Sequence, residues 1–324
     1  MDVLLNILMI IIGLGLLNYG SDWFILGNTK IAKYFKLSNF VIGATVVAFG
    51  TSLPEIVTTL YAAYSDLPMI AVGNALGSCI VNIGFVLGFC ALISPVIIKQ
   101  RSIIKNSQVY LLYSLLLFLL GYNGLDVVDG LILFLLFLCY IIYTIKKRYI
   151  IAEEDRSKKD ISIVLAIIFT IIGLISIFVG SKLFIDGARN IALFLGIPNK
   201  VIGFTLVAFG TSLPEIVVSI TAIRKELGDI VIGNVIGSNM VNIGCALALS
   251  CIITYIPPTR FELIMNLILV ILMVLFMNKN IILEFLGINS NRHFQIGRVE
   301  GLLLFILYLL YSLVITHILK IPIF

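Results

Sequence analysis

The chain has 324 residues, of which 60% are hydrophobic and 12% are charged, and its formal net charge is +5. Soluble domains carry about 25% charged residues, so this composition excludes an ordinary soluble protein and indicates a polytopic membrane protein embedded in a lipid bilayer. The basic residues follow the gaps between apolar segments, so the charge indicates no nucleic-acid partner, and no obligatory protein partner is evident.

Apolar segments near or above the length needed to cross a bilayer, about 20 residues, recur along the chain. We expect ten spans, at residues 3–26, 38–64, 69–98, 107–122, 125–145, 161–185, 198–223, 228–256, 261–278 and 299–320. The first lacks a basic leader region and a small-residue cleavage site, so we interpret it as a retained helix rather than a signal peptide. All the cysteines fall in apolar segments, which predicts free, buried thiols at Cys79, Cys90, Cys139, Cys245 and Cys251.

Lys and Arg are unevenly distributed between the gaps. Most of the 22 lie in the odd-numbered gaps, beginning with Lys30 and Lys33 after the first span. Because basic residues accumulate on the cytoplasmic side, this predicts a plasma-membrane protein with both termini extracellular. Asp126, Asp129 and Asp186 are interpreted as solvated ends of helices.

Two stretches of the chain occur twice, 160 residues apart. Residues 41–57 match residues 201–217 at 15 of 17 positions, and residues 73–84 match residues 233–244 at 8 of 12. We therefore divide the chain into a first five-helix repeat at 1–145 with its motif at 41–84, a cytoplasmic linker at 146–160, and a second five-helix repeat at 161–324 with its motif at 201–244. Five spans per repeat is an odd number, so the second repeat should insert in the opposite orientation.

The predicted fold is an all-α polytopic membrane protein of ten transmembrane helices, arranged as two inverted repeats with proline-broken helices at the centre. Inverted repeats around a midplane site are typical of secondary transporters rather than enzymes. Duplication of a purely structural bundle is the alternative. The identity is concentrated in polar, Pro- and Gly-containing segments, which packing alone would not require.

The sequence GTSLPEI, at residues 50–56 and 210–216, carries the chemistry. Pro54 and Pro214 lack an N–H and should break their helices, which frees carbonyl groups near Gly50 and Gly210. In a membrane such groups need a partner from protein, water or a ligand, and a cation is a natural one.

Side chains of the two motifs offer only oxygen-bearing groups to a cation. Thr51, Ser52 and Glu55 share a helical face, and Ser78 and Asn82 are four residues apart on another helix. The second repeat supplies Thr211, Ser212, Glu215, Ser238 and Asn242. Oxygen ligands suit hard cations, Ca²⁺ above all, with Na⁺ also plausible.

Charge balance favours ion exchange at these glutamates. A charged group at the bilayer centre costs at least about 2.5–3.5 kcal/mol, so unpaired glutamates there need neutralising. One Ca²⁺ would balance the two negative charges, and two or three Na⁺ would leave zero or +1. The alternatives are that Glu55 and Glu215 stay protonated and that the serines only bond their own helices. Asn74 and Asn234 are interpreted as contacts between helices rather than ligands, and the G-x-x-x-G spacings at Gly73 and Gly233 as close helix approaches.

The paired G-T-S-L-P-E and G-N-x-x-G-S segments resemble the two repeats of the cation/calcium exchanger superfamily, particularly its prokaryotic Na⁺/Ca²⁺ exchangers. The resemblance implies alternating access, with Na⁺ entry driving Ca²⁺ out of the cell, and sliding of the first and sixth spans. The ions are cargo, and no cofactor is expected. The gap at 146–160 is too short for the Ca²⁺-sensing domains of animal exchangers.

By motif position the resemblance makes Glu55 and Glu215 the central Ca²⁺ ligands, with the carbonyls of Thr51 and Thr211. The Na⁺ ligands would add four serines and two further carbonyls, and two asparagines would complete the site: Ser52, Ser78, Ser212, Ser238, Ala48, Ala208, Asn82 and Asn242. Some prokaryotic members and the K⁺-dependent branch carry Asp where this chain has Asn242, which weakens a K⁺-dependent interpretation.

Three other functions remain open from the sequence. A Ca²⁺/H⁺ antiporter could use the same two glutamates, although the histidine usual near the second motif of such proteins is absent here. A cation channel could select ions with the same acids. An intramembrane enzyme is the weakest alternative, because no Ser/His or paired Asp arrangement lies within the spans.

Overall fold

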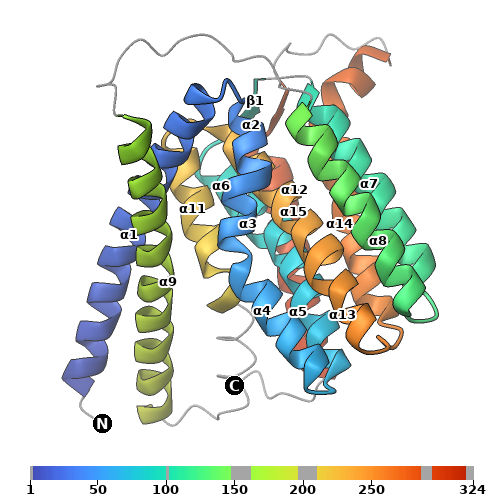
Figure 1. Cartoon of the computed structure of the whole chain (residues 1–324), viewed down its shortest axis with the longest axis horizontal. Helices are drawn as coiled ribbons and strands as arrows, with labels where there is room; N and C mark the ends of the chain where they lie inside the picture. Colours follow the sequence, from blue (N-terminus) through green and yellow to red (C-terminus); the bar gives the residue numbers. More distant parts are fainter. Residues whose placement is uncertain (1–2, 100–101, 147–161, 196–209, 286–293, 319–324) are drawn as a thin grey trace.

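The computed structural model describes residues 3–99, 102–146, 162–195, 210–285 and 294–318. Long apolar helices cross the molecule side by side, and short π-helical segments interrupt three of them (Figure 1). The first half contains α1 (Val3–Tyr34), α2 (Asn39–Ile42), η1 (Gly43–Val47), α3 (Ala48–Thr51), α4 (Leu53–Tyr64), α5 (Pro68–Ile80), η2 (Val81–Leu87), α6 (Gly88–Ile93), β1 (Val96–Ile98), α7 (Ser102–Gly121) and α8 (Val127–Lys146). The second half contains α9 (Ile163–Phe194), α11 (Leu213–Arg224), α12 (Gly228–Val241), η3 (Asn242–Leu247), α13 (Ala248–Ile253), α14 (Arg260–Phe285), β2 (Phe294–Ile296) and α15 (Arg298–Ile318).

Within the described ranges, eight continuous helical segments are long and apolar enough to cross a membrane, and a ninth consists of two helices bent by 49°. The bent pair, Asn39–Thr51 with Leu53–Tyr64, corresponds to the expected span at 38–64. The expected span at 198–223 is described only from residue 210 onward, so its first part lies outside the described residues, as do most of the linker at 146–160 and the motif up to residue 209.

The first and sixth expected spans end well before the helices that the structure shows. The span expected to end at residue 26 continues to Tyr34, and the one expected to end at residue 185 continues to Phe194. These are α1 and α9, which lie against each other at one side of the molecule in Figure 1. Each helix continues past its most apolar stretch because it packs against the other. Asp186 accordingly lies within α9, half-buried, and its prediction as a solvated helix end was wrong.

A row of glycines lets α1 and α9 approach closely. A Cβ added at Gly13 would lie 2.8 Å from the carbonyl oxygen of Gly180, and a Cβ at Gly20 would lie 3.0 Å from that of Gly173. Partners on α9 fall in number as positions on α1 rise, so the two helices are antiparallel. Small residues at such a crossing are typical of helix packing in membranes.

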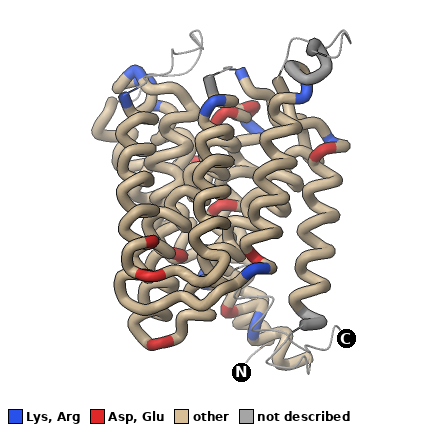
Figure 2. The backbone as a smooth tube through the Cα atoms, turned by 90° about the vertical axis from the view of Figure 1, so that its right-hand side faces the viewer, with Lys and Arg blue, Asp and Glu red and all other residues tan. Residues whose placement is uncertain are grey.

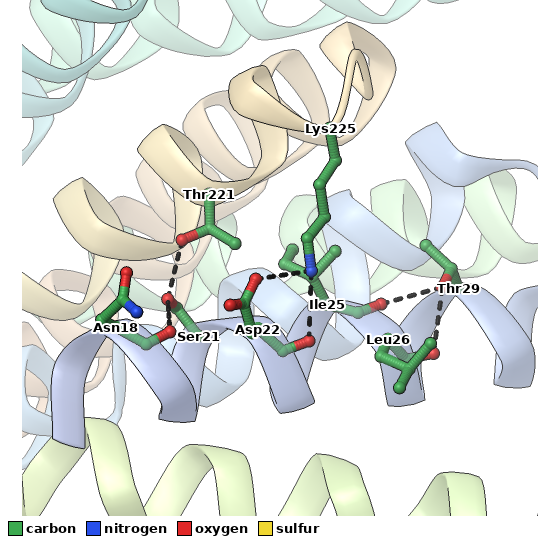
Figure 3. Close-up of polar contacts among 8 residues, drawn as sticks. All are labelled: Asn18, Ser21, Asp22, Ile25, Leu26, Thr29, Thr221 and Lys225. Atoms are coloured by element: carbon green, nitrogen blue, oxygen red, sulfur yellow. Dashed lines mark hydrogen bonds and ion pairs between the residues drawn. The ribbon is translucent and has the colours of Figure 1, made fainter. Parts of the chain in front are cut away.

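Polar contacts at two positions join α1 to the end of α11 (Figure 3). The buried hydroxyls of Ser21 and Thr221 are 2.7 Å apart. One turn away at the surface, Lys225 Nζ lies 2.6 Å from Asp22 Oδ1. These contacts attach the α1–α9 pair to the rest of the bundle.

The third expected span, 69–98, is not helical throughout. Its helix ends at Ile93, and Val96–Ile98 forms β1, which pairs antiparallel with β2. Val96 pairs with Ile296, and Ile98 pairs with Phe294. The all-α prediction is therefore wrong at this point, because Pro95 disfavours helical geometry at Ser94 and the β-branched residues that follow favour a strand.

The helix α12 occupies the centre of the bundle, and every one of its side chains is buried. Its glycines account for this position, because a Cβ at Gly233 would lie 2.6 Å from the carbonyl oxygen of Phe40 and one at Gly237 would lie 2.6 Å from the Cα of Ala44. Gly73 has no neighbour within 4 Å, and residues 203–207, the counterpart of η1, lie outside the described ranges. The close approach is thus confirmed for the second copy.

The outer surface of the bundle is apolar, as a surface in contact with lipid must be. Leu, Ile and Val side chains of α1, α8, α9 and α15 are exposed along their lengths. Cys139 lies on this exposed face and Cys245 is half-buried, so the prediction of five buried thiols is wrong for these two, although all five are free. Figure 2 shows Lys and Arg gathered mainly at the end away from the start of α1 and the end of α15.

Candidate ion-binding site

The first copy of GTSLPEI lies at the bend between α3 and α4. Pro54 has no N–H to give to the carbonyl of Gly50, so the helical hydrogen bonding is interrupted there. Ser52 occupies the break with φ −85° and ψ 8°, and its counterpart Ser212 has φ −85° and ψ 2° before α11. The two copies of the motif therefore form the same local structure.

Each serine at a break faces the glutamate of the other copy. Ser52 Oγ donates to Glu215 Oε1 at 2.9 Å, and Ser212 Oγ lies 3.4 Å from Glu55 Oε1. These four residues are at most 1% exposed. The reciprocal contacts bring two carboxylates from distant parts of the chain into one buried site.

Three further predicted residues lie around the carboxylates. Ser78, on α5, has its Oγ 3.5 Å from that of Ser212. Thr51 Oγ1 lies 3.4 Å from Asn234 Oδ1, and Ser238 Oγ lies 3.5 Å from the same atom. Within the described residues, no third His, Cys, Asp or Glu joins the two glutamates in a metal-sized cluster.

In each copy, one asparagine joins two helices, as expected. Asn74 Nδ2, on α5, donates to Thr59 Oγ1 at 2.8 Å and to the carbonyl of Glu55 at 3.2 Å, both on α4. In the second copy, Asn234 Nδ2 donates from α12 to Ser219 Oγ on α11 at 3.1 Å. The prediction that these amides connect helices is confirmed.

Several buried oxygens of the site lack a partner among the described residues. They include the second carboxylate oxygen of each glutamate and the amide oxygens of two asparagines: Glu55 Oε2, Glu215 Oε2, Asn82 Oδ1 and Asn242 Oδ1. Thr211 Oγ1 is also without a partner. Buried polar atoms are normally hydrogen-bonded, and oxygens left free on residues from both repeats are the kind of ligand that a hard cation takes.

The carbonyl groups predicted as ligands are only partly described. The carbonyl oxygen of Ala48 accepts from the N–H of Ser52 at 3.0 Å and lies 3.4 Å from Thr51 Oγ1. The single proton of that hydroxyl has a nearer acceptor in the carbonyl oxygen of Val47 at 3.2 Å, so the Ala48 carbonyl keeps one of its two lone pairs for a further partner. Its counterpart Ala208 lies outside the described residues.

Two features of the site did not follow from the sequence. Asn82 and Asn242 lie in the π-helical segments η2 and η3, which turn them relative to a regular α-helix. In addition, Asn239, which is not among the residues predicted for the site, accepts a hydrogen bond from Asn82. A signal existed for this residue, because position 239 is Asn where its counterpart in the first copy is Cys79.

Asp126 and Asp129, which were predicted to lie at a solvated helix end, are at the start of α8. Asp126 Oδ1 accepts from the backbone N–H groups of Val128 and Asp129, and these contacts are exposed. They cap α8 and have no contact with the buried glutamates. Both acids are thus structural.

Broken helices around two buried carboxylates, inside a bundle of apolar spans, define a multi-pass membrane protein with a candidate cation site. A family model described as sodium/calcium exchanger protein matches residues 5–146 and 165–317, and the chain belongs to this family. Its members are ion transporters rather than enzymes, and the family supports Na⁺ and Ca²⁺ as transported ions.

Individual relatives agree with this assignment. The sodium/calcium exchanger MaX1 of Methanosarcina acetivorans is 30% identical over 98% of this chain and 100% of its own length. An uncharacterized membrane protein of Methanocaldococcus jannaschii is 46% identical over 93% of this chain and 94% of its own. The sodium-calcium exchanger NCX_Mj, in a structure soaked without Na⁺ and Ca²⁺, matches with a TM-score of 0.86 at 45% identity, over 97% of this chain and 100% of that one.

Proposed function

We propose that the protein exchanges extracellular Na⁺ for intracellular Ca²⁺ across the plasma membrane, by alternating access at a site centred on Glu55 and Glu215. The observation that carries the proposal is the reciprocal pairing of Ser52 with Glu215 and of Ser212 with Glu55. It joins both sequence repeats in one buried site, whose free oxygens are suited to hard cations.

The charge of the site explains why exchange would be obligatory. Two carboxylates without a counter-charge are costly in the membrane interior. One Ca²⁺ neutralises them, and two or three Na⁺ also do so or leave one excess positive charge. The site would then change its accessible side with either ion set bound, whereas the empty, charged site would not. This coupling supports a carrier over a channel.

The antiparallel packing of α1 on α9 supports an inverted relation between the repeats. Gly13 and Gly20 of α1 correspond to Gly173 and Gly180 of α9 at the same offset of 160 residues, and each faces the counterpart of the other. Inverted repeats provide two states of equal architecture that open to opposite sides. In this proposal α1 and α9 slide together on the rest of the bundle, and the end rich in basic residues is cytoplasmic.

The test is Ca²⁺ flux in liposomes that contain the purified protein, driven first by a Na⁺ gradient and then by a pH gradient. Na⁺-driven uptake is expected. Uptake driven only by the pH gradient would instead identify a Ca²⁺/H⁺ antiporter, and Ca²⁺ flux that needs no counter-ion would identify a channel.

Glu55→Gln and Glu215→Gln should each abolish exchange, because one carboxylate alone cannot balance Ca²⁺. Glu226→Gln is the matched control, since Glu226 is an exposed glutamate at the end of α11. Full exchange by either of the first two variants would remove that glutamate from the site.

A further inference from the structure

The side chain of Asn239 connects the candidate site to two neighbouring helices. Its Nδ2 donates to the carbonyl oxygen of Cys79 at 3.2 Å and to the hydroxyl of Tyr110 at 2.9 Å. Its Oδ1 accepts from Asn82 Nδ2 at 2.9 Å. All three side chains are buried, so these bonds are shielded from water.

The direction of these hydrogen bonds follows from the backbone carbonyl of Cys79. A backbone carbonyl such as that of Cys79 only accepts hydrogen bonds, so Asn239 must present its NH₂ group to it. The oxygen of Asn239 then faces Asn82, which must answer with its own NH₂ group. The oxygen of Asn82 is thereby turned away from Asn239.

The amide oxygen of Asn82 is the atom left for a cation. Asn82 Oδ1 is buried and has no partner among the described residues. Asn82 follows Ser78 by four residues, and Ser78 contacts Ser212 beside Glu55. We propose that Asn239 is a positioning residue, which acts through Asn82 by holding the oxygen of that amide, rather than its nitrogen, toward the transported cation. This inference rests on the proposed function of the site.

The two halves of the site differ in this respect. The counterpart of Asn239 in the first copy is Cys79, whose Sγ contacts the Asn239 carbonyl oxygen at 3.8 Å and has no amide to offer. Asn242, the counterpart of Asn82, has both amide atoms buried without a partner in the described part of the chain. The amide of Asn82 is therefore held by a hydrogen bond from which its oxygen points away, whereas no hydrogen bond within the described residues orients the amide of Asn242.

The test is equilibrium Ca²⁺ binding to the purified full-length protein, measured by calorimetric titration in Na⁺-free buffer. Asn239→Leu keeps the approximate volume and removes every bond of the amide. It should weaken Ca²⁺ binding roughly tenfold, because the Asn82 amide loses the bond that orients its oxygen. Asn82→Ala should weaken binding by a similar factor.

The double variant separates positioning from a merely structural role. If Asn239 acts through Asn82, then Asn239→Leu should cause little further loss of Ca²⁺ affinity in the Asn82→Ala background. Additive losses would overturn the inference, as would a single variant, Asn239→Leu or Asn82→Ala, with the affinity of the original chain.

A milder variant covers the case in which Asn239→Leu does not fold. Tyr110→Phe removes one of the two acceptors of Asn239 Nδ2 and should weaken Ca²⁺ binding in the same direction, again only when Asn82 is present. Tyr113→Phe is its matched control, because the Tyr113 hydroxyl on the same helix bonds the carbonyl of Leu133 instead. Equal effects of the two Tyr variants would contradict the inference.

The outcome also distinguishes this inference from the proposed function. Absence of Ca²⁺ binding by the original chain would overturn both. Binding by the original chain that is lost in Glu55→Gln, together with additive losses at Asn82 and Asn239, would leave the exchanger site intact and overturn the role of Asn239 alone.

Discussion

At the level of single residues, the hydroxyls at the helix breaks fix the direction of the two carboxylates. Ser52 reaches Glu215 at 2.9 Å, whereas Ser212 reaches Glu55 at 3.4 Å and also contacts Ser78. Hydrogen bonds to a charged group contribute about 1.5–3 kcal/mol each. The shorter contact should therefore contribute more to ion binding than the longer one.

This difference predicts unequal effects of two equivalent substitutions. Ser52→Ala should raise the Ca²⁺ concentration for half-maximal exchange by roughly tenfold or more, and Ser212→Ala should raise it by less. Ca²⁺ uptake by liposomes under a fixed Na⁺ gradient measures both. Ser65→Ala, at an exposed serine after α4, is the control. Equal effects of the two variants would show that the contact lengths do not matter.

The principal acids of the site were predictable because buried charge is rare and needs a reason. Glu55 and Glu215 lie in apolar spans beside a proline, and the sequence therefore predicts that both belong to one site. In the structure, each glutamate contacts the serine of the other copy. The role of Asn239 was not predictable, because the direction of an amide depends on the carbonyl of Cys79 that it meets across the bundle.

At the level of elements, α1 and α9 meet along a surface formed by glycine. Gly13, Gly20 and Gly27 recur every seven residues on one face of α1, and a Cβ at any of them would collide with α9. Gly15 lies on the same helix with nothing within 4 Å of its Cβ position. The interface is therefore close, yet only one side of α1 forms it.

Replacing a glycine inside the interface and one outside it should have different effects on stability and exchange. In Gly20→Ala the added methyl would lie 2.8 Å from Ser176 Cβ and 3.0 Å from the Gly173 carbonyl oxygen, which forces the helices apart. Overpacking of this kind costs about 1–3 kcal/mol, so the thermal midpoint in detergent should fall and exchange should slow. Gly15→Ala should change neither. A Gly20→Ala protein with the original midpoint would contradict the close packing.

Helix breaks were predictable from proline, but the π-helical segments and the strand pair were not. Pro54 cannot donate to the carbonyl of Gly50, so the preceding helix cannot continue regularly through it, and the bend in the second span follows from the local sequence. The segments η2 and η3 instead depend on tertiary packing, because a helix accepts an inserted residue only where its neighbours leave space. Likewise β1 forms because β2, about 200 residues later, lies beside it.

At the level of the whole molecule, the sequence repeat is more symmetric than the structure. Ser21 and Asp22 of α1 are bonded to Thr221 and Lys225 of α11. The counterpart of Ser21 on α9 is Ser181, whose hydroxyl is buried without a partner in the described residues. One half therefore makes a contact that the other half lacks, which is the asymmetry expected of one state in an alternating mechanism.

The offset of 160 residues indicates where the corresponding contact would form in the opposite state. Asp22 corresponds to Lys182, and Lys225 corresponds to Ser65, which adjoins Asp66. In the second pair the base, Lys182, is on α9 and the acid, Asp66, follows α4, so the charges are exchanged but still attract each other. Both Asp66 and Lys182 are exposed, and the described structure records no ion pair between them. If both states occur, the Asp22–Lys225 pair forms in one state and the Asp66–Lys182 pair forms in the other. The two pairs then lie on opposite sides of the membrane.

Cross-linking should therefore trap two different states. The background carries Cys139→Ser and Cys245→Ser, which remove the two thiols that are not fully buried. In this background, a short reducible thiol reagent should join Asp22→Cys to Lys225→Cys. Exchange should then stop until the cross-link is reduced. Lys182→Cys with Asp66→Cys should also be joined, but only as the protein visits the opposite state. Each single-cysteine variant, treated in the same way, controls for modification alone. The exposed ion pair contributes at most about 1 kcal/mol, so Lys225→Ala without cross-linking should shift the balance between states by no more than about fivefold. Failure of the second pair to cross-link under conditions of active exchange would contradict the inverted relation between the halves.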